Sequence, residues 1–196
     1  MRTNSRAEIL KCAMMLFSKN GYEGTSPNEI VETVGITKPT MYYFFGDKEG
    51  LLNTLLSENY TKLNDVLNHV CIYHPDPENY DNDVKPLLMR IAKSIFKFAE
   101  LYKEFFIYNI SLNSAPVESK AAKVSEKYSL EQYEIITRLF SEISKAHGNL
   151  AGKEATLAFR FISLLNAQVT LWFREKSDLS DTTAESLVIG FMHGIF

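Results

Sequence analysis

The residues best suited to chemistry lie between Thr37 and Phe45, which read Thr-Lys-Pro-Thr-Met-Tyr-Tyr-Phe-Phe. Hydroxyl, ammonium and phenol groups can donate hydrogen bonds to phosphate oxygens, and their carbon atoms can contact thymine methyl groups. The alternative is that these are ordinary packing residues. However, neighbouring residues of a helix point about 100° apart, so Tyr42 and Tyr43 cannot both face one core. We therefore expect at least one of them to face a nucleic acid, with Met41 and Phe45 as the core anchors.

Three short helices are predicted to position this stretch, because each has a recognisable start and stop. The starts and stops are the capping box Ser5-Arg6-Ala7-Glu8 with Gly21, the pair Ser26-Pro27 with Gly35, and Thr37 with Gly46. Three short helices with a glycine-bearing turn before the last one are typical of a helix-turn-helix, whose last helix enters the major groove of DNA. We assign this DNA-binding domain to residues 1–50.

Charge does not by itself favour a nucleic-acid partner, because the net charge of the chain is −3. Residues 1–52 hold six Lys and Arg against six Asp and Glu, so the negative balance lies in the remainder. An acidic body repels phosphates at long range. Any DNA contact must therefore come from local geometry in the first domain.

Residues 9–52 resemble the DNA-binding head of the TetR family of bacterial transcriptional regulators. The matching positions are Ile9-Leu10, Leu16-Phe17, Gly21-Tyr22, Thr25-Ser26, Ile30, Val34 to Lys38, Thr40 to Phe45 and Lys48 to Leu52. The resemblance implies DNA contacts, mostly to phosphates, from Thr25 or Ser26, Thr37, Lys38, Tyr42, Tyr43 and Lys48, with Pro39 and Thr40 nearest the base edges. Pro39 stands where the family commonly has Gly, and Phe44 where it commonly has His.

Lys48 also has a physical reason to lie near a phosphate. It falls in the first turn of a helix expected to start after the cap Asp47, where a cation opposes the helix dipole unless an anion is close. A lone exposed lysine is the alternative.

The rest of the chain, residues 51–196, is predicted to be a helical body, so the whole fold is all-α. Helical periodicity continues to Val70, breaks over a loop at 72–83, and resumes at about 86–102, 104–112, 117–146, 153–174 and 182–195. No useful run of alternating apolar and polar residues indicates a strand.

The resemblance further implies that the body binds a small-molecule effector and forms a homodimer through its last two helices. Candidate effector contacts are Phe98, Tyr102, Phe105, Asn109, Tyr133 and Asn166. Candidate dimer contacts are Leu157, Phe161, Leu165, Trp172, Leu187 and Phe191. In both cases the alternative is an ordinary core. We expect a repressor that leaves its double-stranded DNA operator when the effector binds. An effector that binds more tightly when the two DNA-binding domains are wrongly spaced must weaken DNA binding by the same factor as that preference.

Other classes of protein lack support in the sequence. We find no phosphate loop, nucleophile motif or metal-ligand spacing, so we expect neither an enzyme nor a metal or cofactor. Cys12 and Cys71 are expected to be reduced thiols, no segment is apolar enough for a membrane span, and no export signal is visible, which together favour the cytoplasm. A helical protein-interaction module without DNA binding remains the alternative, and a weak dependence on salt would distinguish it.

Overall fold

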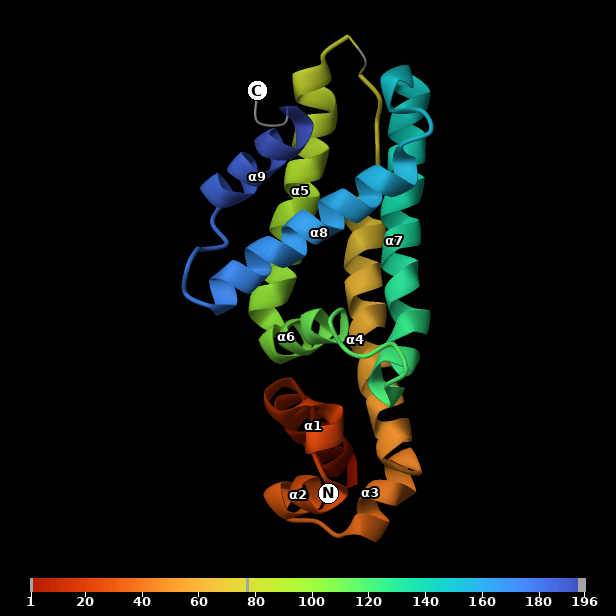
Figure 1. Cartoon of the computed structure of the whole chain (residues 1–196), viewed down its shortest axis with the longest axis vertical. Coiled ribbons are helices and arrows are strands. Elements are labelled where there is room, and N and C mark those ends of the chain that lie inside the picture. Colours follow the sequence, from red (N-terminus) through yellow and green to blue (C-terminus); the bar gives the residue numbers. More distant parts are fainter. Residues whose placement is uncertain (1, 77, 194–196) are drawn as a thin grey trace. The chain divides into compact units, whose positions relative to one another are not determined.

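The computed structural model describes residues 2–76 and 78–193, and every regular element in that part of the chain is a helix (Figure 1). The expected all-α fold class is therefore confirmed. The chain divides into two compact units: the first joins the chain up to Thr61 with Tyr102–Tyr128, and the second joins Lys62–Leu101 with the chain from Ser129 onwards. Helices α4 (Lys48–Val70) and α7 (Lys120–Ala146) each supply residues to both units. The functional division at residue 50 stays a prediction.

The first unit opens with α1 (Arg2–Gly24), which is interrupted at Gly21. Gly21 has φ 73° and ψ 169°, a conformation that favours glycine, so the chain turns where the sequence predicted a stop. The start was predicted wrongly, because α1 begins three residues before Ser5. No proline or glycine in that short stretch prevents the helix from extending past the capping box.

Helices α2 (Pro27–Val34) and α3 (Lys38–Phe45) have the predicted bounds. The Ser26 hydroxyl accepts a hydrogen bond from the backbone N–H of Glu29 at 3.1 Å, and the left-handed Gly35 ends α2. Thr37 occupies the cap position of α3 but makes no capping hydrogen bond with its side chain. That detail of the prediction was wrong.

The turn from α3 into α4 depends on Gly50. Asp47 accepts a hydrogen bond from the Gly50 N–H at 2.7 Å, and a Cβ atom on Gly50 would lie 2.0 Å from the carbonyl oxygen of Phe45. Only glycine fits this close approach of two backbone segments.

The remainder of the first unit is α6 (Lys103–Leu112) and the start of α7. Aromatic side chains hold α6 to α1 and α4: Phe17 packs on Tyr108 with ring centroids 5.9 Å apart, and Tyr60 packs edge-on against Phe105 at 5.2 Å. Helix α6 thus shares a core with the helices of the predicted DNA-binding domain.

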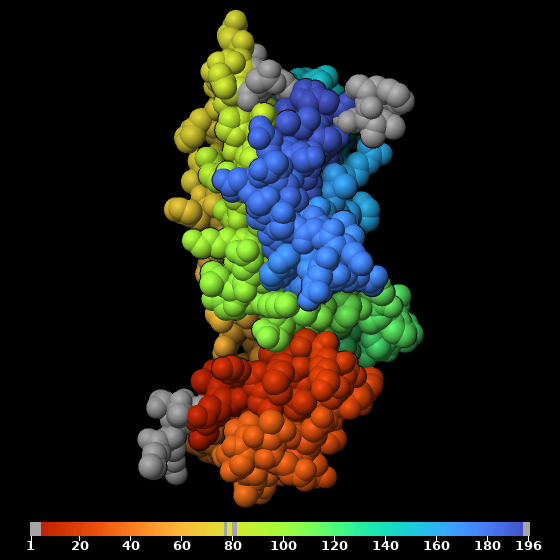
Figure 2. Space-filling view, turned by 90° about the vertical axis from the view of Figure 1, so that its left-hand side faces the viewer, coloured from red at the N-terminus to blue at the C-terminus, as the bar shows by residue number. Residues whose placement is uncertain are grey.

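The second unit is built around α5 (Tyr80–Leu101), with α8 (Glu154–Phe173), α9 (Asp181–His193) and a short 3-10 turn at Gly148–Leu150. Figure 2 shows α9 and part of α8, in blue, lying against α5, in green. The buried rings of Phe140 and Phe161 pack with the half-buried ring of Phe191. The pairs Lys85–Glu185 and Lys93–Asp181 join α5 to α9.

One boundary in the second unit was predicted wrongly. Helix α5 begins at Tyr80, six residues before Pro86, so the predicted loop at 72–83 is shorter. Pro86 therefore lies inside α5, where a proline costs a backbone hydrogen bond and crowds the preceding turn, so tertiary contacts of that turn must offset the cost. The carboxylate of Asp83 accepts hydrogen bonds from Tyr73 Oη at 2.8 Å and pairs with His147 Nε2 at 2.7 Å.

No helix of the described chain is long and apolar enough to cross a membrane. Among the same residues, no three His, Cys, Asp or Glu side chains gather in a group that could hold a metal ion.

Candidate nucleic-acid interface

Helix α3 divides its aromatic residues between the core and the surface. Met41 and Phe45, four residues apart, are buried on one face. Tyr42 is 39% exposed and Tyr43 is 78% exposed, so both phenols lie at the surface. An eight-residue helix that presents adjacent tyrosines outward has the chemistry expected of a DNA-contacting helix.

The start of α3 adds polar groups to the same surface. Thr37, Lys38 and Pro39 are exposed, and Thr40 is half-buried. The hydroxyls of Thr37 and Thr40 are 3.0 Å apart, so one donates to the other and both are held in place. One hydroxyl hydrogen of this pair stays available for an outside acceptor.

Tyr43 is supported from within its own helix. Its ring lies edge-on to Phe44 at 5.3 Å, and Phe44 in turn lies 6.0 Å from the buried Phe45. Phe44 is half-buried and stands where the family commonly has His. Its ring lies between the buried Phe45 and the exposed Tyr43 and contacts both.

At the start of α2, the sequence suggested Thr25 or Ser26 as a DNA contact, and only Ser26 is exposed. Thr25 is only 1% exposed, and its hydroxyl donates to the carbonyl of Gly21 at 2.9 Å. Its side chain is thus committed to closing the turn after α1, which argues against a phosphate contact. Ser26 is exposed, although its hydroxyl already accepts the capping hydrogen bond of α2.

Lys48 has a partner that the sequence did not reveal. Its ammonium lies 4.0 Å from the centre of the Tyr22 ring, within the range of a cation–π interaction. Burial lowers the pKa of Lys48, although the charge of Glu23 opposes this change. Burial, together with Glu49, Glu23 and Asp47, raises the pKa of Tyr22 to about 12. The position of Lys48 therefore has an explanation besides a phosphate.

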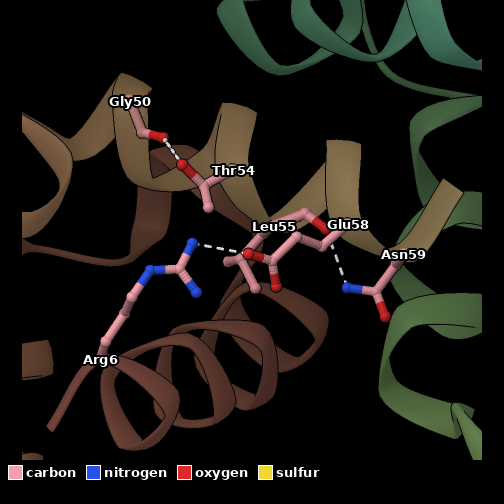
Figure 3. Close-up of polar contacts among 6 residues, drawn as sticks. All are labelled: Arg6, Gly50, Thr54, Leu55, Glu58 and Asn59. Atoms are coloured by element: carbon pink, nitrogen blue, oxygen red, sulfur yellow. Dashed lines mark hydrogen bonds and ion pairs between the residues drawn. The ribbon is translucent and has the colours of Figure 1, made fainter. Parts of the chain in front are cut away.

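Arg6 is a supporting residue that the sequence analysis missed. Its guanidinium donates to Glu58 of α4 at 2.6 Å and lies 5.7 Å from the centre of the Phe45 ring in α3. Figure 3 shows Arg6 reaching from α1 to Glu58, while Thr54 and Asn59 bond back to carbonyls of α4 itself. Arg6 and Glu58 are 52 residues apart, so no local pattern could have paired them.

The predicted dimer contacts divide into buried and half-buried side chains. Phe161 and Leu165 are at most 1% exposed within one chain, and Phe161 packs 5.1 Å from Phe191. Within one chain these two side chains face the core of their own unit, and their assignment to the dimer contact stays a prediction. Leu157, Trp172, Leu187 and Phe191 are half-buried. The exposed large apolar residues of α8 and α9 are instead Phe159, Leu164, Leu171 and Ile189.

The predicted effector contacts do not form one group within a single unit. Tyr102, Phe105 and Asn109 belong to the first unit, where the Asn109 oxygen accepts a hydrogen bond from Tyr60. Phe98, Tyr133 and Asn166 belong to the second unit, where Tyr133 stacks on Phe159 at 6.1 Å. The set stays a prediction.

Comparison with known proteins supports the same interpretation. Residues 9–55 match the family model of bacterial regulatory proteins, tetR family. The transcriptional repressor AcnR of Corynebacterium glutamicum is 34% identical over 85 residues, which are 40% of this chain and 45% of AcnR. The chain spans about half the length of the curated relatives it matches.

Solved structures share the fold over nearly the whole chain. FadR of Bacillus subtilis, in complex with stearoyl-CoA, superposes with a TM-score of 0.78 at 16% identity, covering 97% of this chain and 99% of FadR. AibR, in complex with isovaleryl coenzyme A and operator DNA, gives 0.70 at 20% identity, covering 95% and 96%. Residues 9–55 are therefore a helix-turn-helix head of the TetR family, on a chain with the fold of TetR-family regulators.

Proposed function

We propose that this protein is a sequence-specific DNA-binding transcriptional repressor and has no enzymatic role. The observation that carries the proposal is the exposure of Tyr42, Tyr43 and Lys38 on a short helix whose other face is anchored by Met41 and Phe45. The matched head and the named repressors among the relatives support it.

The proposed DNA contacts lie on α3 and at the starts of α2 and α4. They are Ser26, Thr37, Lys38, Pro39, Thr40, Tyr42, Tyr43 and Lys48. The side chain of Thr25 is left out because it is buried. In this proposal the hydroxyls and ammonium groups hold phosphates, while Pro39 and Thr40 approach the base edges.

The proposed active form is a homodimer, because two heads must enter successive major grooves about 34–36 Å apart. Leu164 of α8 is 42% exposed, Leu171 is 44% exposed, and Ile189 of α9 is 40% exposed. Exposed aliphatic side chains on two helices suit a self-complementary twofold contact. The proposal adds this face to the predicted dimer contacts.

The proposed signal is a small-molecule effector that releases the operator in the cytoplasm. FadR and AibR are each described with an acyl-CoA bound, and AibR also with operator DNA. Helix α4 starts directly after α3 and continues into the second compact unit. We propose that the tilt of α4 sets the distance between the DNA-binding domains of the two subunits.

The test is fluorescence anisotropy with duplex DNA that flanks the gene of this protein. We expect Lys38→Ala to weaken binding and to reduce the slope of log affinity against log salt by about 1. Lys97→Ala is the matched control, because it removes the same charge from an exposed position on α5. Equal behaviour of the two variants, or binding that barely changes with salt, would favour the protein-interaction module instead.

A further inference from the structure

Two side chains of α7 meet a single residue near the start of α4. The side-chain oxygen of Asn53 accepts a hydrogen bond from Lys127 Nζ at 2.5 Å and another from Tyr128 Oη at 2.9 Å. An ammonium group can only donate, so the atom of the Asn53 amide that faces it must be the oxygen. The two partners are 74 and 75 residues from Asn53 in sequence, and all three residues belong to the first compact unit.

The ring of Tyr128 is itself held by packing. It stacks on the ring of Tyr60 with centroids 5.9 Å apart, and Lys127 Nζ lies 4.6 Å from the centre of the Tyr128 ring. Tyr60 is 1% exposed and donates a hydrogen bond to Asn109 of α6. Asn53 and Tyr60 are seven residues apart, so they lie on the same face of α4. A ring packed on a buried residue therefore presents the Tyr128 hydroxyl to Asn53.

Asn53 also lies close to the tight turn that joins α3 to α4. It comes three residues after Gly50, where an added Cβ atom would lie 2.0 Å from the carbonyl oxygen of Phe45. Backbone segments packed this closely have little freedom to move separately. A side chain that fixes the start of α4 therefore also fixes the direction of α3.

A second contact between the starts of α4 and α7 is too exposed to have this effect alone. Lys120 Nζ lies 3.3 Å from Glu49 Oε2, and the two side chains are 66% and 50% exposed. Ion pairs in solvent contribute little, because water and salt screen them. Asn53 and Tyr128 are both half-buried, so their hydrogen bond is better shielded from water.

We propose that Asn53 is a positioning residue for DNA binding, held by Lys127 and Tyr128 so that α3 keeps one orientation. None of the three touches DNA in this proposal, because they act through α4. Without their contacts the start of α4 moves more freely, and ordering it on DNA costs affinity. The proposal rests on the proposed function, because it concerns the same DNA-contacting surface.

The first test measures operator affinity of the full chain by fluorescence anisotropy over a range of salt concentrations. We expect Asn53→Leu to weaken binding about five- to tenfold and Tyr128→Phe about threefold. The slope of log affinity against log salt should keep its wild-type value in both, because no phosphate contact is lost. Asn59→Leu is the matched control on the same helix, since the Asn59 amide donates to the Leu55 carbonyl of α4 itself at 2.8 Å. This control should bind as the wild type does.

Two further variants separate positioning from direct contact. If Tyr128 acts through Asn53, the double variant Asn53→Leu/Tyr128→Phe should bind no more weakly than Asn53→Leu alone. Lys127→Met should lose affinity with an unchanged salt slope. Additive losses in the double variant, or wild-type affinity in Asn53→Leu, would overturn the proposal. A slope reduced by about 1 in Lys127→Met would also overturn it, since Lys127 would then contact a phosphate directly.

The second test measures backbone hydrogen exchange of the α3–α4 turn, residues 44–52, in the absence of DNA. We expect exchange there to be about three- to tenfold faster in Asn53→Leu than in the wild type, and unchanged in Asn59→Leu. Unchanged exchange in Asn53→Leu would overturn the proposal. This measurement needs no operator. A wild type that fails to bind the operator would therefore count against the proposed function alone, while the exchange rates still decide the role of Asn53.

Discussion

Helices α3 and α8 both carry more apolar side chains than one face can bury, but they expose different kinds. Helix α3 buries Met41 and Phe45 and exposes the two phenols of Tyr42 and Tyr43. Helix α8 buries Phe161 and Leu165 and exposes the aliphatic Leu164. A phenol combines a flat apolar ring with a hydrogen-bonding tip, whereas an exposed leucine gains only by leaving water. The difference indicates a polar partner for α3 and an apolar partner for α8.

The strongest test of this comparison is made on the two faces of α8. We expect Phe161→Ala to lower the free energy of unfolding by about 3–5 kcal/mol, because it opens a cavity among packed aromatic rings. Leu164→Ala should lower it by about 1 kcal/mol or less, since much of this side chain is already in solvent. Urea unfolding at one fixed protein concentration measures both. Equal losses would mean that the two faces are not distinct.

A second test compares the turn before α4 with the turn after α7. Gly50→Ala should lower the free energy of unfolding by about 1–3 kcal/mol, because the new methyl group would collide with the Phe45 carbonyl. Gly148→Ala should be nearly neutral, since nothing lies within 4 Å of its added Cβ. Thermal unfolding measures the difference. A neutral Gly50→Ala would show that the α3–α4 turn tolerates rearrangement.

The exposed phenols can be tested without disturbing the fold. Tyr43→Ala should weaken operator binding by about tenfold, corresponding to roughly 1–1.5 kcal/mol. Its thermal stability should stay close to that of the wild type, because most of the side chain is in solvent. Tyr43→Phe separates the hydroxyl from the ring and should retain part of the affinity. Anisotropy and thermal unfolding of each variant are the measurements. Loss of stability in Tyr43→Ala would assign Tyr43 to packing.

The smallest expected effect concerns the thiol of Cys71 in the second unit. Burial raises the pKa of Cys71 from an ordinary value near 9 to about 12, although the charges of Arg90 and Arg138 oppose this. A raised thiol pKa stabilises the fold below pH 9, and this contribution is lost as the pH rises through 12. Thiolate absorbance of Cys12→Ala should therefore rise near pH 12 when folded and near pH 9 in urea. Coincident titrations would contradict an effect of partial burial on Cys71.

Much of the first unit could be predicted from short stretches of sequence. Ser26 caps α2 and Gly35 ends it because cap chemistry depends on residues three or four positions apart. Gly46 ends α3 for the same reason. Thr25 could not be assigned from its type alone, since an exposed and a buried threonine look identical in sequence. Its burial follows from the kink at Gly21, whose carbonyl accepts its hydroxyl.

Predictions about the second unit were incomplete where side chains compete for one interior. Helical spacing identified an apolar face on α8, but not whether that face packs within the chain or against another copy. Asn53 of the first unit shows the same limit, because its partners Lys127 and Tyr128 lie 74 and 75 residues away. No pattern within α4 indicates these partners.

The sequence by itself determined the all-α class, the helix-turn-helix and most helix ends, because these depend on contacts within a few residues. Only the tertiary structure decided that Arg6 supports α3 and α4, that Phe161 is core while Leu164 is exposed, and that α7 holds Asn53. Each of these depends on side chains brought together from distant parts of the chain, and periodicity in one helix carries no information about the neighbour that will cover it.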